Sequence, residues 1–186
     1  CKCRNTIPIW HKVLIMATNL EFIKSAEVTS TTTTLEITDC FNANYDVYYV
    51  AIRNFNSDNS ANTIYLRFLD SSNTVINSGS LYARADLALN SGSSFTEGKE
   101  TATDRINIGT TNADTKGNLN VSVNVFNSFD SGSYTFITYQ TSARELEARK
   151  GIAVLKQTST IKGLQLKSDT GGRNFTQGNI SVYGVK

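Results

Sequence analysis

The segment that decides the fold is the last one, residues 161–186, IKGLQLKSDTGGRNFTQGNISVYGVK. It predicts a strand, a glycine-rich turn and a second strand. Gly171 and Gly172 at the reversal supply the positive φ angles that a tight hairpin needs. In the second strand, Ile180 and Val182 alternate with more polar neighbours, which is typical of a strand with one buried face. We expect this strand to be held inside a sheet at the end of the chain.

Strand-like segments of the same kind recur along the rest of the chain. The clearest alternation of apolar and polar residues is residues 119–126, LNVSVNVF, and residues 134–140 are its expected hairpin partner. Residues 45–55, YDVYYVAIRNF, are apolar nearly throughout, which predicts a strand at the centre of a sandwich. A second hairpin is expected between residues 64–70 and residues 74–76.

Two regions fit this pattern less well. Within residues 90–118, only residues 105–109 look like a strand. Residues 143–150, ARELEARK, have a helical composition, and we expect one or two turns of helix or a charged loop there. Altogether the chain shows about eight to ten strands at regular spacing and no alternation of strands with helices. The pattern indicates an all-β sandwich or barrel.

Length and composition set the organisation of the chain. We expect two parts, an N-terminal extension or arm at residues 1–18 and a single β-sandwich domain at residues 19–186. Three of the 18 basic residues lie in residues 1–15, which hold no acidic residue, so the remainder has 15 basic and 16 acidic residues. A nearly neutral body argues against a nucleic-acid partner. No stretch approaches the roughly 18 apolar residues of a membrane span, so no membrane partner is expected.

Residues 1–15, CKCRNTIPIWHKVLI, differ in character from the rest of the chain. Three hypotheses stay open: an extension foreign to the natural chain, because Met16 resembles a translation start; an arm that docks on a partner subunit; or a mature lipoprotein with lipid on Cys1. The docking arm is the hypothesis to test first, because the segment combines apolar and basic residues. Its candidate partner-binding residues are the apolar ones, Ile7, Ile9, Trp10, Val13 and Leu14.

The sequence is poor in residues for catalysis. His11 is the only histidine and lies outside the expected domain, which argues against a catalytic triad and a two-histidine zinc site. Cys40 stands alone in the body, and we expect it to be a buried small hydrophobe. No glycine-rich loop lies between a strand and a helix, so nucleotide binding is unsupported. We therefore expect no catalytic residue, no cofactor, no metal and no enzyme activity.

Aromatic side chains offer another kind of site. Tyr48 and Tyr82 are candidate glycan-binding residues, because exposed tyrosine rings stack on sugar rings. The competing interpretation is that such tyrosines fill the edge of the core with the hydroxyl reaching water.

The end of the chain resembles a known class of proteins. Residues 175–185, F-x-x-G-x-I-x-V-Y-G-V, after residues 161–166, I-x-G-L-x-L, resemble the C-terminus of many small structural proteins of tailed bacteriophage virions. The resemblance is strongest over residues 150–186 and weaker over residues 44–140. It implies an antiparallel jelly-roll-like β-sandwich.

The function implied by this resemblance is that of a non-enzymatic virion structural protein, above all an accessory capsid (decoration or cement) or head-fibre protein. The expected partners are other virion proteins, namely the major capsid protein or tail proteins, together with further copies of the chain in a homo-oligomer such as a trimer. The expected location is the virion, assembled in the host cytoplasm. The alternative is a tail-associated carbohydrate-binding (receptor-binding) module, for which a glycan would be the ligand.

Overall fold

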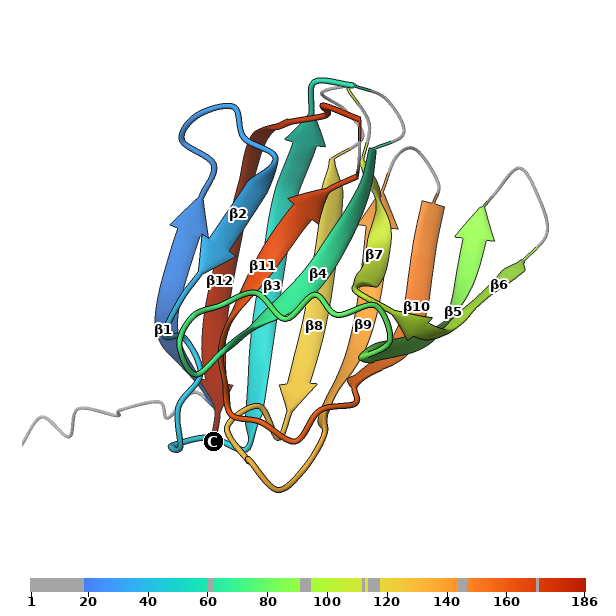
Figure 1. Cartoon of the computed structure of the whole chain (residues 1–186). Coiled ribbons are helices and arrows are strands. Elements are labelled where there is room, and N and C mark those ends of the chain that lie inside the picture. The colour runs from blue at the N-terminus through green and yellow to red at the C-terminus, as the bar shows by residue number, and fades with distance from the viewer. Residues whose placement is uncertain are drawn as a thin grey trace, which may run out of the picture.

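The computed structural model describes residues 19–59, 62–90, 95–111, 113, 118–143, 147–169 and 171–186. Within these residues the chain forms twelve strands and no helix that could cross a membrane (Figure 1). The strands are β1 (Leu20–Glu27), β2 (Thr34–Ile37), β3 (Val47–Ser57), β4 (Asn62–Asp70), β5 (Tyr82–Asn90), β6 (Thr96–Thr103), β7 (Ile106–Thr111), β8 (Leu119–Phe126), β9 (Thr135–Ala143), β10 (Glu147–Leu155), β11 (Ile161–Ser168) and β12 (Phe175–Val185).

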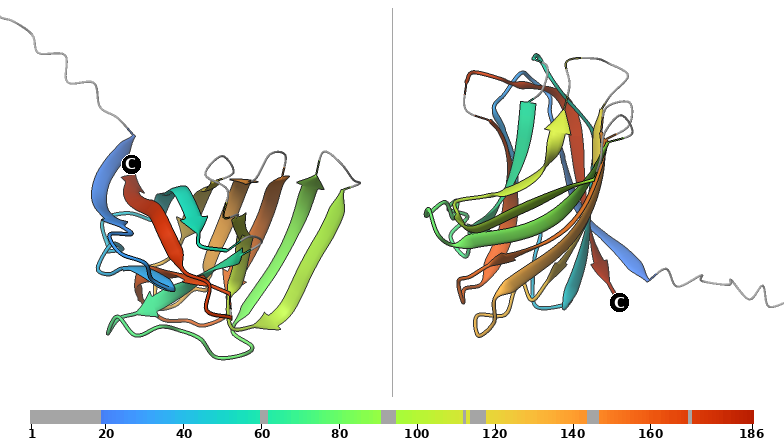
Figure 2. Two further views of the ribbon diagram at one scale, coloured as in Figure 1. Left: turned by 90° about the horizontal axis from the view of Figure 1, so that it is seen from above. Right: turned by 90° about the vertical axis from the view of Figure 1, so that its right-hand side faces the viewer.

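The strands form two antiparallel sheets packed face to face. The larger sheet has the order β1-β12-β3-β8-β9-β10-β5-β6, and the smaller one has the order β2-β11-β4-β7. The smaller sheet covers only part of the larger one, so that β10, β5 and β6 extend beyond it (Figures 1 and 2). We call these three strands the overhang. The predicted all-β sandwich is therefore confirmed, with twelve strands in the described residues instead of eight to ten.

Eight of the strands pair in a nested order. Setting β5, β6, β9 and β10 aside, β1 pairs with β12, β2 with β11, β3 with β8 and β4 with β7. This is the pairing of one long antiparallel hairpin, rolled so that successive pairs fall alternately in the larger and the smaller sheet. Two further pairings, β12 with β3 and β11 with β4, close the roll.

The core lies between the sheets and follows from the alternation of side chains along each strand. Four residues of β8 point inward and are buried, while the residues between them are half-exposed, as residues 119–126 predict. Cys40 is fully buried in the same core, where loss of hydration raises the pKa of its thiol to about 12. The expectation that Cys40 is a buried small hydrophobe is thus confirmed.

The C-terminal segment differs from its prediction in one respect. β12 does lie inside a sheet, between β1 and β3, as expected. However, β11 and β12 belong to different sheets, so the predicted hairpin is wrong and the turn between them crosses from one sheet to the other. Gly171 and Gly172 do have positive φ, at 138° and 75°, but they serve this crossing. Local turn chemistry is the same in both cases, which is why the sequence favoured a hairpin.

Other local predictions have mixed outcomes. β8 and β9 form the expected hairpin, but residues 74–76 contribute only an isolated bridge, between Leu69 and Val75, opposite β4. The helical composition of residues 143–150 was misleading, because Ala143 ends β9 and β10 begins at Glu147. β6 was missed entirely, since its sequence TEGKETAT is almost wholly polar and both of its faces are largely exposed. It is an edge strand, for which charged residues are typical.

Candidate binding surface on the eight-stranded sheet

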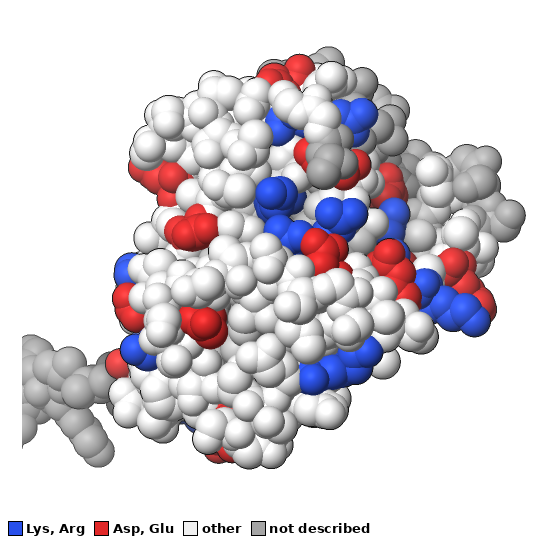
Figure 3. Space-filling model, in the orientation of Figure 1, with Lys and Arg blue, Asp and Glu red and all other residues white. Residues whose placement is uncertain are grey.

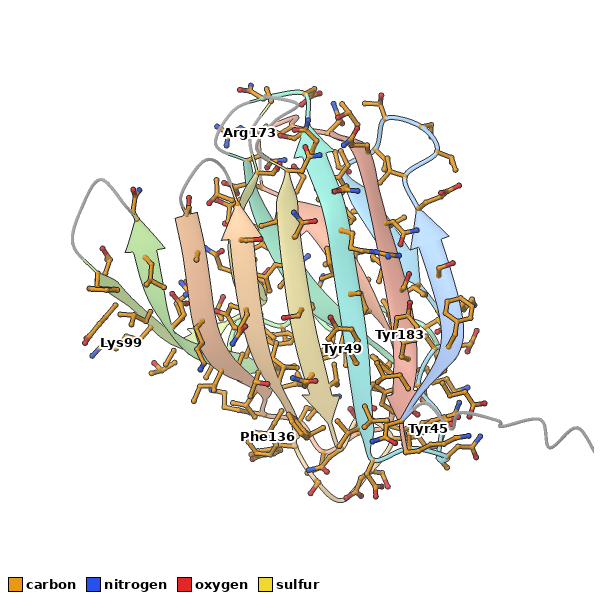
Figure 4. The ribbon with its side chains drawn as sticks, turned by 180° about the vertical axis from the view of Figure 1, so that it is seen from behind. Tyr45, Tyr49, Lys99, Phe136, Arg173 and Tyr183 are labelled. Carbon is orange, nitrogen blue, oxygen red and sulfur yellow. The ribbon has the colours of Figure 1, made fainter. Side chains whose placement is uncertain are left out.

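The larger sheet has an outer face that no other layer of the described chain covers (Figure 4). Along β3, Tyr48 and Val50 point into the core, so Tyr49 and Ala51 point to this outer face, where they are half-exposed. The outer face of an antiparallel sandwich is normally polar. Here a large part of it is apolar, and this departure marks it as the candidate functional surface.

Strand register places seven apolar side chains next to one another across seven strands. Each is paired with the next, in the order Leu20, Val185, Val47, Phe126, Phe136, Val154 and Ala83. We call this set the apolar row. None of its members is buried, and Leu20 and Phe136 are 42% and 46% exposed. Contiguous exposed apolar area of this kind is a feature of interaction surfaces.

Three aromatic rings lie beside one end of the apolar row. Phe22 on β1, Tyr183 on β12 and Tyr49 on β3 are in register with one another. The ring centroid of Tyr183 is 5.7 Å from that of Phe22 and 6.1 Å from that of Tyr49, within the range of favourable aromatic contacts (Figure 4). Phe22 is 58% exposed. We call this set the aromatic ladder, and it extends the apolar surface along the strands.

Toward the other end of the strands, the outer face is hollowed, and polar and charged side chains stand among apolar ones. A hollow of about 740 Å³ is lined by residues of β8, β9, β10, β5 and β6, and one of about 340 Å³ by residues of β3, β8 and β9. The two hollows share Ser122 and Gln140, which are paired in register. Together they form one depression across the sheet, which we call the groove.

Charged side chains stand at both ends of the groove. Lys99, Lys150 and Glu97 line the larger hollow, and Arg53 lines the smaller one (Figure 4 labels Lys99). Among the described residues, neither lysine nor Glu97 takes part in an ion pair. Arg53 donates hydrogen bonds of 3.0 Å to neighbouring side chains of β12. Three cations against one carboxylate make the outer side of the groove electropositive.

Asp86 also lines the larger hollow, but its carboxylate lies on the inner side of the sheet. There it pairs with Arg84, which also binds Glu100 at 2.7 Å, and accepts a hydrogen bond of 3.1 Å from the Tyr139 hydroxyl. The Tyr139 hydroxyl is also 3.2 Å from the carbonyl oxygen of Asn107 on β7. Figure 3, which shows the side of the smaller sheet, has basic and acidic atoms interspersed. This inner network ties the overhang to the smaller sheet.

The two predicted glycan-binding tyrosines are not on this surface. Tyr48 and Tyr82 are fully buried, and the prediction that their rings stack on sugars is wrong. The Tyr48 hydroxyl accepts a hydrogen bond of 2.7 Å from the Asn42 amide, and the Tyr82 hydroxyl donates one of 2.9 Å to the Ile76 carbonyl. Burial raises the pKa of both hydroxyls. Both residues are part of the core.

The predicted partner-binding residues, Ile7, Ile9, Trp10, Val13 and Leu14, lie outside the described residues. The exposed apolar residues of the outer face were missed. A signal for them exists in residues 45–55, which carry apolar side chains in both phases of the strand alternation. That pattern was interpreted as burial on both faces, whereas in the structure it reflects one buried face and one apolar, half-exposed face.

Among the residues that the structure describes, no three His, Cys, Asp or Glu side chains are grouped to hold a metal ion. Comparison with models of protein families, with curated proteins and with solved structures finds no match to this chain. Its function therefore has to be argued from the fold and the outer face.

Proposed function

We propose that this chain is a non-enzymatic structural protein of a bacteriophage virion, an accessory capsid (decoration or cement) or head-fibre protein. The observation that carries the proposal is the nested pairing of eight strands in two sheets. We interpret this pairing order as that of a jelly roll, an architecture found in viral capsid and lectin domains. The two hairpins β5–β6 and β9–β10 are then additions at one edge of the jelly roll. The resemblance of residues 161–185 to phage structural proteins supports the same conclusion.

The apolar row supports a role in assembly. A protein that attaches to a particle needs a surface that becomes buried, and so dehydrated, in the contact with a neighbouring subunit. Burying one large apolar side chain contributes about 1.5–3 kcal/mol to the free energy of such a contact. The row offers two phenylalanines, Phe126 and Phe136, at its middle, where interface residues contribute most. The neighbours are other virion proteins, such as the major capsid or tail proteins, and further copies of the chain in a homo-oligomer such as a trimer. The protein then resides in the virion after assembly in the host cytoplasm.

Purified particles from the source of the gene provide the test. Quantitative mass spectrometry should find the chain in a fixed ratio to the major capsid or tail protein. The variant Phe136→Ser should be incorporated several-fold less. Phe95→Ser is the matched control, because Phe95 is 68% exposed but lies outside the apolar row. Absence of the chain from particles, or equal incorporation of the two variants, would contradict the proposal.

The N-terminal arm is tested separately, by removing residues 1–18. The deletion stops there because β1 pairs with β12 from Leu20 onward and belongs to the sandwich. Loss of oligomerisation in light scattering, or loss of incorporation, would support docking through Ile7, Ile9, Trp10, Val13 and Leu14. Full incorporation of the shortened chain would show that the arm is not needed and that attachment depends on the domain itself.

A further inference from the structure

We propose that the groove on the outer face is a binding site for an acidic oligosaccharide. This inference goes beyond the structural role proposed above and does not depend on it. It rests on the shape of the groove, on the side chains that line it and on the direction in which it crosses the sheet.

The floor of the groove presents hydroxyl and amide groups that are free to bind. Ser122, Gln140 and Ser142 line it from adjacent strands, β8 and β9. Among the described residues, none of these three side chains makes a hydrogen bond. Hydroxyl and amide groups both donate and accept, which matches the hydroxyl groups of sugars. The strands hold the groups at a fixed spacing of about 4.8 Å across the sheet, so they need little ordering on binding.

The charges favour an acidic sugar over a neutral one. Lys150 is in register with Gln140 on one side and Leu87 on the other, and Lys99 lines the same hollow from β6. Within the part of the chain that the structure describes, Glu97 is the one acidic side chain on the outer side of this hollow. A sugar carboxylate would therefore find an unpaired ammonium group beside the neutral polar groups, which is the arrangement that gives a charge-assisted hydrogen bond.

Apolar side chains border these polar groups where a sugar ring would need them. Tyr49, from the aromatic ladder, lines the smaller hollow, and Ile152, which is 60% exposed, lines the larger one. The C–H faces of pyranose rings pack on such surfaces while their hydroxyl groups bind to polar neighbours. A concave site with an apolar border and a few convergent polar groups is the usual form of a small-ligand site.

The direction of the groove argues against a peptide. It runs across the strands from β3 to β6, a distance of about 24 Å for five inter-strand steps. The main-chain groups beneath it are already paired within the sheet, so a peptide laid along it could not add as a strand. Nucleic acid is disfavoured because phosphate contacts dominate such binding, and the described residues of the groove include only three cations, Arg53, Lys99 and Lys150. An oligosaccharide can bind in the groove through contacts with side chains alone.

The experiment is a glycan array followed by titration calorimetry on the full chain. The probes are oligosaccharides that contain uronic or sialic acid, with neutral oligosaccharides of the same length beside them. We expect the acidic probes to bind, and Lys150→Gln to weaken their affinity by about tenfold or more, the loss expected for one charge-assisted hydrogen bond. Lys167→Gln is the matched control, since Lys167 is a lysine of β11 in the smaller sheet. It should leave the affinity unchanged.

Several results would overturn this proposal: no binding of any acidic probe, equal binding of neutral and acidic probes, or equal losses for Lys150→Gln and Lys167→Gln. Tyr49→Ala should weaken binding as well, and thermal melting by circular dichroism checks that each variant is folded. Particle incorporation is measured in parallel. Lys150→Gln should leave it unchanged, because Lys150 lies outside the apolar row, so failure of the glycan site and failure of the structural role are distinguishable.

Discussion

Replacing Gly151 by alanine should destabilise the protein by about 2–4 kcal/mol, through a collision with one aromatic ring. A Cβ atom at position 151 would lie 2.5 Å from Cζ of Tyr139 and 2.6 Å from its hydroxyl oxygen. The ring therefore has to move and lose its contacts with Asp86 and Asn107. The two hydrogen bonds contribute about 1 kcal/mol each and the strain of overpacking adds about 1–3 kcal/mol, so the collision costs about 3–5 kcal/mol. The preference for alanine over glycine within a strand offsets about 0.5–1 kcal/mol of this cost.

The assay is urea unfolding of Gly151→Ala in the native background and in a Tyr139→Ala background. Without the ring there is nothing for the new methyl group to strike, and alanine within a strand is favoured over glycine by about 0.5–1 kcal/mol. The same change should then be stabilising, so the coupling between the two sites should reach about 3–5 kcal/mol, the cost of the collision itself. Gly79→Ala is the control, since Gly79 has no neighbour within 4 Å of the added atom. An equal cost of Gly151→Ala in both backgrounds would refute the reasoning.

Three further predictions concern buried groups. Burial raises the pKa of the Cys40 thiol to about 12 in the folded protein. The neutral thiol therefore contributes its full stabilisation at pH values below the pKa of the unfolded thiol, and this stabilisation is lost as the pH rises toward the folded pKa. Above about pH 9, the unfolding free energy should therefore fall by up to about 1.4 kcal/mol per pH unit more steeply than in Cys40→Ala, and equal slopes in urea titrations would contradict this. Tyr48→Phe should cost about 1 kcal/mol and leave glycan binding unchanged, because the ring is buried; weaker binding in calorimetry would show otherwise. Arg84→Met should cost about 3–5 kcal/mol, because it leaves the buried Asp86 carboxylate with the more distant Arg149, at 3.8 Å, as its cationic partner. Adding Asp86→Leu should restore most of this loss, as compared by urea unfolding.

The fold class follows from the sequence because period-2 alternation reports directly on a half-buried strand. Residues 119–126 show this most clearly, and each of their apolar members is buried in the structure. Which strands pair with one another is harder to predict from the sequence. Residues 171 and 172 provide the same glycine-rich reversal whether the next strand returns in the same sheet or crosses to the other. The choice depends on the partners of β11 and β12, which come from segments 91 or more residues away, since Ile161 pairs with Asp70.

The candidate site could be predicted only in part. An apolar residue on an outer face has the same sequence pattern as one in the core, so Tyr49 could not be distinguished from Tyr48 until the phase of β3 was known. The glycan prediction named the wrong residues because the sequence does not show which face of each strand is buried. A shift of one position exchanges the two faces of a strand. The apolar row and the groove depend on the register of strands that are distant in sequence. No local pattern contains that information.

The two added hairpins explain why the larger sheet offers both surfaces. In the nested order, β8 is the last strand of the larger sheet, and β9, β10, β5 and β6 continue from it without breaking any nested pair. On β10 and β5 the inner side still adds Ala153, Leu155 and Tyr82 to the apolar core, and the network of Arg84, Asp86 and Tyr139 lies farther along the same strands. The outer side of the same strands forms most of the groove. Because the eight nested strands do not need these additions to complete their pairing, substitutions at Lys99 or Lys150 should change what the groove binds while the roll folds as before.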